Sequence, residues 1–178
     1  MYVAFLCFMN IQLIIGEDTT STPGINSIDF IVNAGPVLYK SNFGLSFGID
    51  GTINTDDNFF RARYNHQEAF SLFDSPTETV NDLGLITGVQ IHKRIWYFDS
   101  GIGASAVFGI KQGRLLESGW FTSVYETIPY ATLGIPFEMT GMIKGKYAGC
   151  GISFKGNINS ERSYIGLFLL AKITIPTK

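Results

Sequence analysis

The stretch FGLSFGIDGTIN, from Phe43 to Asn54, decides the fold class of this chain. Large apolar residues alternate with small or polar ones almost without interruption, and the apolar set comprises Phe43, Leu45, Phe47, Ile49 and Ile53. Successive side chains of a β-strand point to opposite faces, so a period of two describes a strand with one apolar and one polar face. A helix would repeat its apolar residues every three or four positions, and this stretch does not.

The same alternation returns at the end of the chain, where the apolar parity runs from Ile165 through Leu169 to Ile175. When the rest of the sequence is read by this rule, it predicts eight strands, near residues 27–39, 43–54, 59–70, 79–92, 95–110, 124–139, 146–158 and 162–175. Each of them reaches the roughly 9–11 residues that a tilted membrane-spanning strand needs.

The composition fits a membrane environment better than a soluble one. Charged residues make up 16% of the chain, against roughly 25% in soluble globular domains, and apolar residues make up 46%. No apolar run approaches the roughly 18 residues of a membrane-spanning helix. A net charge of −2 also argues against a nucleic-acid-binding protein, which would carry a basic surplus.

The polar face of the predicted strands indicates which side meets lipid. It is rich in Gly, Ser, Thr, Asn and Asp, whereas a water-exposed outer face would carry many Lys and Glu. Small side chains suit the narrow lumen of an eight-stranded barrel. The apolar parity also carries aromatic residues that we expect to form interfacial girdles, namely Phe60, Trp96, Phe98, Tyr130 and Phe137.

The fold prediction is therefore all-β, an eight-stranded antiparallel up-and-down transmembrane β-barrel. The alternative is a soluble, lipocalin-like barrel with its apolar face inside and an apolar ligand bound there, because alternation alone does not distinguish the two.

Three segments are predicted along the chain. Residues 1–16 have the length and apolar character of a signal peptide, with a buried first strand as the alternative. Residues 17–26 are polar, contain Pro23 and Gly24, and are expected to form a flexible lead-in. Residues 27–178 form the barrel domain. Removal of the leader would leave only Cys150, which excludes an intrachain disulfide and a cysteine-rich metal site.

An even number of strands with both termini in the periplasm places the connections after the odd-numbered strands outside the cell. The two longest predicted connections, Ser71 to Thr79 and Lys111 to Ser123, fall on that side. The second is long and aromatic, so it is the best candidate for recognition of an outside partner; its candidate residues are Arg114, Trp120, Phe121 and Tyr125.

Several segments of the sequence resemble a known group of proteins. They are NFFRARYN at 58–65 with Glu68 and Phe70, Gly119 to Phe121, YETIP at 125–129, TLGIPFE at 132–138 and NINSE at 157–161. Together they resemble the small, OmpA-type or porin-like outer-membrane β-barrel proteins common in Bacteroidetes. The resemblance implies an outer-membrane barrel of unassigned function, with no catalytic residues to transfer.

Charged residues of both signs occupy the predicted lumen parity: Asp50, Arg61, Arg63, Asp82, Asp99, Glu138, Lys155 and Lys172. A buried charge without a partner is costly, so we expect these groups to pair with one another. An eight-stranded barrel leaves no open aqueous channel. The charged residues are therefore expected to form a structural plug, not an ion or proton path, and the protein is not expected to act as a general porin.

His66, Glu68 and Ser71, near the outer end of the third strand, are the only set that resembles a catalytic site. A serine nucleophile and a histidine base at the lipid interface would suit a lipid acyl hydrolase or transferase. However, Ser71 lies on the opposite parity to His66, and such a site is defined by geometry.

The functional prediction is a non-enzymatic structural or surface-interaction protein of the bacterial outer membrane. Its predicted partners are outer-membrane lipid and lipopolysaccharide and an unidentified envelope or extracellular protein, with no nucleic acid, cofactor or metal. The soluble carrier and the lipid-modifying enzyme stay as alternatives.

Overall fold

The computed structural model describes residues 25–39, 42–70, 74–75, 77–120 and 123–177 of the chain. Within them the elements are all strands: β1 (Ser27–Tyr39), β2 (Phe43–Asn54), β3 (Asn58–Ala69), β4 (Asp74–Ser75), β5 (Thr79–Lys93), β6 (Trp96–Ser118), β7 (Ser123–Lys144), β8 (Ala148–Asn159) and β9 (Tyr164–Pro176). No helix among these residues is long and apolar enough to cross a membrane.

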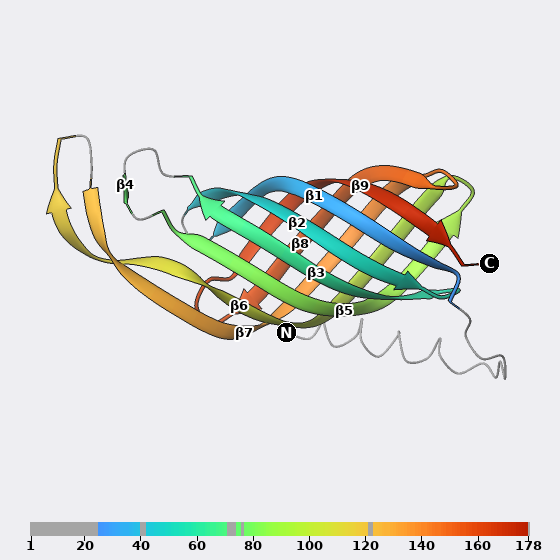
Figure 1. The fold of residues 1–178 in the computed structure, drawn as a ribbon, viewed down its shortest axis with the longest axis horizontal. Helices are drawn as coiled ribbons and strands as arrows, with labels where there is room; N and C mark the ends of the chain where they lie inside the picture. The colour runs from blue at the N-terminus through green and yellow to red at the C-terminus, as the bar shows by residue number, and fades with distance from the viewer. Residues whose placement is uncertain (1–24, 40–41, 71–73, 76, 121–122, 178) are drawn as a thin grey trace, which may run out of the picture.

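Eight of these strands form a closed antiparallel barrel (Figure 1). Each pairs with its neighbour along the chain, and β9 closes the wall by pairing with β1. The two-residue β4 is not part of the wall and pairs in parallel with the start of β7. The predicted fold class is confirmed, and the strand boundaries agree within a few residues except in β6 and β7.

The register of the strands fixes the width of the barrel. A path across the paired residues starts at Asn54 on β2 and returns to β2 at Gly44, ten residues nearer the other end. The path runs through Asn54, Phe59, Gly88, Gly101, Glu138, Lys155, Gly166, Val37 and Gly44. This stagger tilts the strands by about 40° and leaves a lumen that side chains fill.

The two faces of the wall differ as the alternation predicts. Large apolar side chains point outward and are exposed, for example Phe47 (61%), Leu133 (82%) and Leu169 (72%). The inward face buries most of the polar and charged side chains of the wall. This is the reverse of a soluble carrier barrel, whose apolar face lines the interior.

The two ends of the barrel are built differently. The end that carries Ser27 and Pro176 has the short connections 55–57, 94–95 and 145–147, and we call it the turn end. The other end, which we call the loop end, carries the connections after β1, β3, β6 and β8 (Figure 1). The longest predicted connections do lie at one end, opposite the barrel's termini.

The predicted loop from Lys111 to Ser123 is wrong for most of its length. β6 continues to Ser118 and β7 begins at Ser123, so the two strands form a hairpin that projects beyond the rest of the wall (Figure 1). The register shifts between Gln112 and Leu115 and again before Glu117. These irregularities break the period of two, and the alternation rule therefore ended the strand too early.

The girdle prediction is wrong for Tyr130 and Phe137. Tyr130 shares the inward parity of β7, packs against a buried apolar cluster and donates a hydrogen bond to the carbonyl of Thr79. Phe137 faces outward but lies well inside β7, with its ring 6.1 Å from that of Phe154. Trp96 and Phe98 are exposed near the turn end, as predicted.

Lumen-facing glycines make room for a large ring. Gly88 and Gly101 are paired across β5 and β6, and an added Cβ at either would lie 2.8 or 2.7 Å from the ring of Phe59. The Phe59 ring in turn lies 4.7 Å from the guanidinium of Arg61. The small residues therefore help to position a central charge of the lumen.

Candidate functional site

The lumen holds all eight of the charged residues predicted to face it, and each is at most 5% exposed. A ninth, Asp29 on β1, lies among them at 1% exposure. With Asp29 included, every strand of the wall contributes at least one charge. The interior is thus a set of cross-barrel ion pairs built from side chains that are distant in sequence.

Arg61 lies at the centre of this set. Its Nη2 donates to Oδ2 of Asp99 at 2.7 Å, and its Nη1 contacts Oε1 of Glu138. Its Nε donates to Oγ1 of Thr52 at 2.8 Å. One guanidinium therefore joins β2, β3, β6 and β7, and a planar group with several donors suits such a junction.

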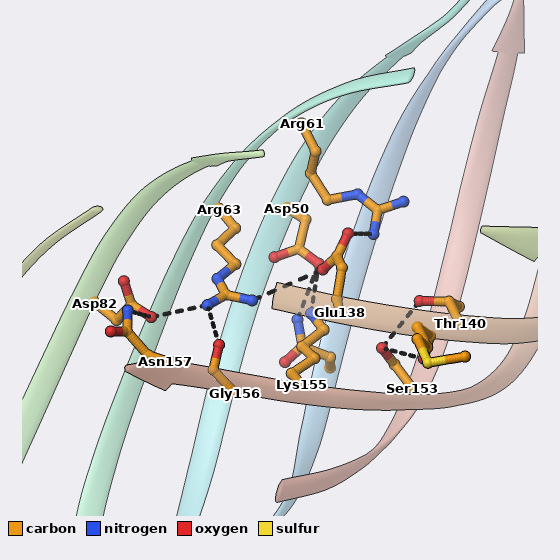
Figure 2. A network of polar contacts seen from close by, with 12 residues as sticks. Asp50, Arg61, Arg63, Asp82, Glu138, Thr140, Ser153, Lys155, Gly156 and Asn157 are labelled. Atoms are coloured by element: carbon orange, nitrogen blue, oxygen red, sulfur yellow. Dashed lines mark hydrogen bonds and ion pairs between the residues drawn. The ribbon is translucent and has the colours of Figure 1, made fainter. Parts of the chain in front are cut away.

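Arg63 forms a second junction nearer the loop end (Figure 2). Its Nη2 donates to Oδ2 of Asp82 at 2.9 Å, and its Nη1 lies 3.7 Å from Oε2 of Glu138. Asp82 also accepts hydrogen bonds from Asn157, at 3.0 Å, and from the hydroxyl of Tyr164. Glu138 is therefore shared by the two arginines, as Figure 2 shows.

Two lysines complete the network. Lys155 donates to Oδ2 of Asp50 at 2.7 Å, between β8 and β2. Lys172 donates to Oδ2 of Asp29 at 2.9 Å and lies 3.9 Å from the centre of the Tyr97 ring. Sequence reasoning missed Asp29, although it shares the polar parity of β1 with Ser27 and Asn33, which was the signal that would have found it.

The chemistry of this arrangement is that of a plug. Every basic group of the lumen has a carboxylate within ion-pair distance, and the side chains themselves are inaccessible to water. A buried charge is tolerated only when it is paired, and each of these pairs joins two different strands. The pairing therefore favours the register at which the charges meet. Among the described residues, no cluster of three or more His, Cys, Asp or Glu side chains could hold a metal ion.

An apolar layer closes the lumen above the charges, toward the loop end. It consists of Val37, Tyr39, Ala69, Val80, Val107, Tyr164 and Phe168, with Tyr130 packed against it. Glu78 then connects the loops above this layer. It contacts Arg162, accepts a hydrogen bond from Asn42 at 3.3 Å, and accepts another from the backbone N–H of Gln112 at 3.1 Å.

The candidate recognition residues lie on the projecting hairpin. Arg114 is exposed on β6, and Trp120, beside the hairpin tip, is 99% exposed. Tyr125 lies on β7, half-buried, and pairs with Leu115. Phe121 lies outside the described residues. The structure therefore places three of the four on one hairpin.

The set that resembles a catalytic site in sequence is not assembled among the described residues. His66 and Glu68 lie on the outward face of β3, and Ser71 lies outside the described residues. Nδ1 of His66 contacts Oδ1 of Asn81 at 2.9 Å, and its Nε2 contacts Oε1 of Glu68 at 3.2 Å. Asn81 also accepts a hydrogen bond from the hydroxyl of Tyr64 at 2.8 Å. Both ring nitrogens are therefore engaged by amide and carboxylate groups.

Solved structures of outer-membrane proteins share this fold. Neisserial surface protein A (NspA) aligns with a TM-score of 0.64 at 9% identity, covering 87% of this chain and 100% of that one. The N-terminal β-barrel domain of Pseudomonas aeruginosa OprF aligns with a TM-score of 0.57 at 11% identity, covering 85% and 99%. Ail, the attachment invasion locus protein of Yersinia pestis, aligns with a TM-score of 0.57 at 9% identity, covering 86% and 100%.

These alignments cover nearly the whole of each known barrel, so the chain has the fold of eight-stranded outer-membrane proteins. No family model matches the sequence, and no curated protein matches it significantly. The narrower resemblance to barrels of Bacteroidetes stays a prediction.

Proposed function

We propose that this protein resides in a bacterial outer membrane, with its turn end toward the periplasm and its loop end outside the cell. The apolar outer face of the wall supports this proposal, because large exposed apolar surfaces are stable only where lipid or protein covers them. In this location outer-membrane lipid and lipopolysaccharide surround the barrel. The fold it shares with three outer-membrane proteins supports the same location.

We further propose that the protein works by contact at the cell surface, without catalysis. The observation that carries this proposal is the projecting hairpin. Trp120 is 99% exposed, and Leu116 and Leu115 on the same hairpin are 55% and 46% exposed. Aromatic and apolar groups with a charged rim are the usual centre of a protein contact, and Arg114 and Glu117 supply that rim here.

The sealed interior argues against transport as the function. The ion-pair network and the apolar layer above it leave the lumen filled with side chains. The names of two neighbours, a surface protein and an attachment invasion locus protein, are consistent with a role at the surface.

The test is an adhesion assay with cells that display the protein. We expect the triple variant Leu115→Ser, Leu116→Ser, Trp120→Ser to lose most of the adhesion that the wild type gives on wells coated with extracellular-matrix protein or with serum protein. Glu126→Gln and Thr127→Ser, on the same hairpin, serve as matched controls and should adhere like the wild type. Equal adhesion by the triple variant, at equal surface amounts, would overturn the proposal.

A second measurement addresses transport. The purified barrel in planar lipid bilayers should show no steady open-channel conductance at neutral pH. A stable conductance of porin size would contradict the proposed closed lumen.

A further inference from the structure

The lipid-facing side of the wall is hollowed near the turn end. Two adjoining hollows of about 350 and 530 Å³ lie there and share Gly141 and Ile152. Most of their lining is apolar and comes from β5 to β9; it includes Ile91, Trp96, Phe98, Met139, Cys150 and Leu169. Together they form a furrow across several strands, open to the surroundings of the barrel.

Gly141 leaves the furrow open. It pairs with Phe98 on β6, and a Cβ added to Gly141 would meet only the Phe98 ring, at 3.4 Å. A larger side chain would therefore fit at this position without displacing backbone. Because glycine has no side chain, a space remains between Phe98 and Ile152, the two residues that Gly141 pairs with.

Basic residues lie on the two turns next to the furrow, and one of them, Lys146, also lines a hollow at the mouth of the barrel with Asp56 and Lys144. The turns β5–β6 and β7–β8 are neighbours, since the backbone N–H of Lys144 donates to the carbonyl of Ile95 at 2.7 Å. These turns carry Lys93, Arg94 and Lys146, all exposed. Lys93 also pairs with Trp96, which lines the second hollow. Within the described part of the chain, no carboxylate lies within ion-pair distance of these three cations.

The loop end carries the opposite charge balance. Its described charged residues outside the lumen are mostly acidic: Glu68, Glu78, Glu117, Glu126 and Glu161, against Lys111, Arg114 and Arg162. At the turn end the corresponding set is mostly basic: Lys93, Arg94, Lys144 and Lys146, against Asp56 and Asp57. Unpaired basic charge is thus gathered at the end where the furrow lies.

The backbone conformation of the β5–β6 turn is a further observation about Arg94. Arg94 has a φ of 56°, in the left-handed region that glycine adopts most readily. The chain keeps an arginine at a position where glycine would be less strained.

We propose that this region binds an anionic phospholipid of the leaflet at the turn end. Its acyl chains lie in the two hollows, and its phosphate contacts Lys93, Arg94 and Lys146. The inference rests on the proposed location in a membrane.

Trp96 provides a direct readout, because the chain has two tryptophans: Trp96 begins β6 at the turn end, whereas Trp120 follows the opposite end of the same strand. The Trp120→Phe variant is reconstituted in phosphatidylethanolamine vesicles that contain a small fraction of phosphatidylglycerol or phosphatidylethanolamine with brominated acyl chains. We expect brominated phosphatidylglycerol to quench Trp96 at a lower mole fraction than brominated phosphatidylethanolamine, by about fivefold for each basic residue that contacts the phosphate. Both leaflets have the same composition, so the direction of insertion does not matter.

Matched variants separate charge from shape. In the Trp120→Phe background, Lys93→Gln, Arg94→Gln, Lys146→Gln together should abolish the preference, whereas Lys111→Gln, Arg114→Gln at the loop end should leave it unchanged. Gly141→Leu should weaken quenching, whereas Gly51→Leu, which faces open space on the lipid side of β2, should not. Arg94→Gly should lower the preference while the barrel stays at least as stable.

Two outcomes would overturn the lipid site. One is equal quenching by the two brominated lipids in the inserted barrel; the other is a preference that survives in the triple charge variant. A barrel that fails to insert, and is quenched by neither lipid, would contradict the proposed membrane location instead.

Discussion

The barrel interior and the β6–β7 hairpin use the same strands in opposite ways. Inside the wall, Asp99 on β6 and Glu138 on β7 are at most 5% exposed and paired with Arg61. Beyond the wall, the hairpin that the same two strands form leaves Leu115 46% and Trp120 99% exposed. The difference is one of packing, since the interior is buried and ion-paired and the hairpin is exposed, so substitutions in the two regions should have separable effects.

The largest effect is expected at Glu138. Glu138→Ala would remove the carboxylate that Arg61 and Arg63 share and leave each of these buried arginines with one aspartate. It should lower the free energy of unfolding by about 3–5 kcal/mol. Urea titration of the barrel in lipid vesicles, followed by heat-modifiable migration on gels, measures this. Glu126→Ala on the exposed hairpin is the control and should change stability by less than about 0.5 kcal/mol. Equal losses in the two variants would contradict the division between the regions.

A smaller effect is expected when a lumen-facing glycine is replaced by a residue with a side chain. Gly101→Val should destabilise the barrel by about 1–3 kcal/mol, because its Cβ would lie 2.7 Å from the Phe59 ring and 2.8 Å from Ile86. The same urea titration measures it. Gly51→Val, which meets no atom within 4 Å, is the matched control. A Gly101→Val barrel as stable as the Gly51→Val barrel would show that the interior is less tightly packed than described.

Between the two regions lies the Glu78 junction, and its loss should act locally. Glu78→Ala removes the contacts to Arg162, Asn42 and the Gln112 backbone and should cost about 1–2 kcal/mol. Amide hydrogen exchange should rise at the loop end and stay unchanged at the turn end. Faster exchange throughout the wall would mean that this junction supports the whole barrel.

The smallest effect on stability is expected at the hairpin tip. Trp120→Ser should change the free energy of unfolding by less than about 0.5 kcal/mol, because a side chain that is 99% exposed gives up no packing. Urea titration checks this, and the adhesion assay run in parallel should show a clear loss. A large destabilisation would indicate that the tip packs against another part of the protein.

Much of this architecture could be predicted from local patterns. The parity of the strands placed Arg61 and Lys172 in the lumen and Phe47 outside, because alternation is a property of each strand alone. The same reasoning failed at Leu115, where irregular register hides the period. Tyr130 was assigned to the lipid face, although the parity count along β7 from Leu133 and Ile135 turns it inward. The same reasoning also left out Asp29, although its parity on β1 points inward; only the closure of β1 against β9 shows that its partner is Lys172.

The sequence by itself determined the number of barrel strands, the face that meets lipid and the kinds of groups that fill the lumen, since each depends on residues close together in the chain. Only the tertiary structure decided which charges meet. Arg61 and Glu138 are 77 residues apart, and Lys172 and Asp29 are 143 apart. These pairs form because closure at one stagger brings distant strands face to face across a narrow lumen. The furrow at Gly141 beside Lys93 and Lys146 likewise arises from the register of β5 to β9, which local patterns do not reveal.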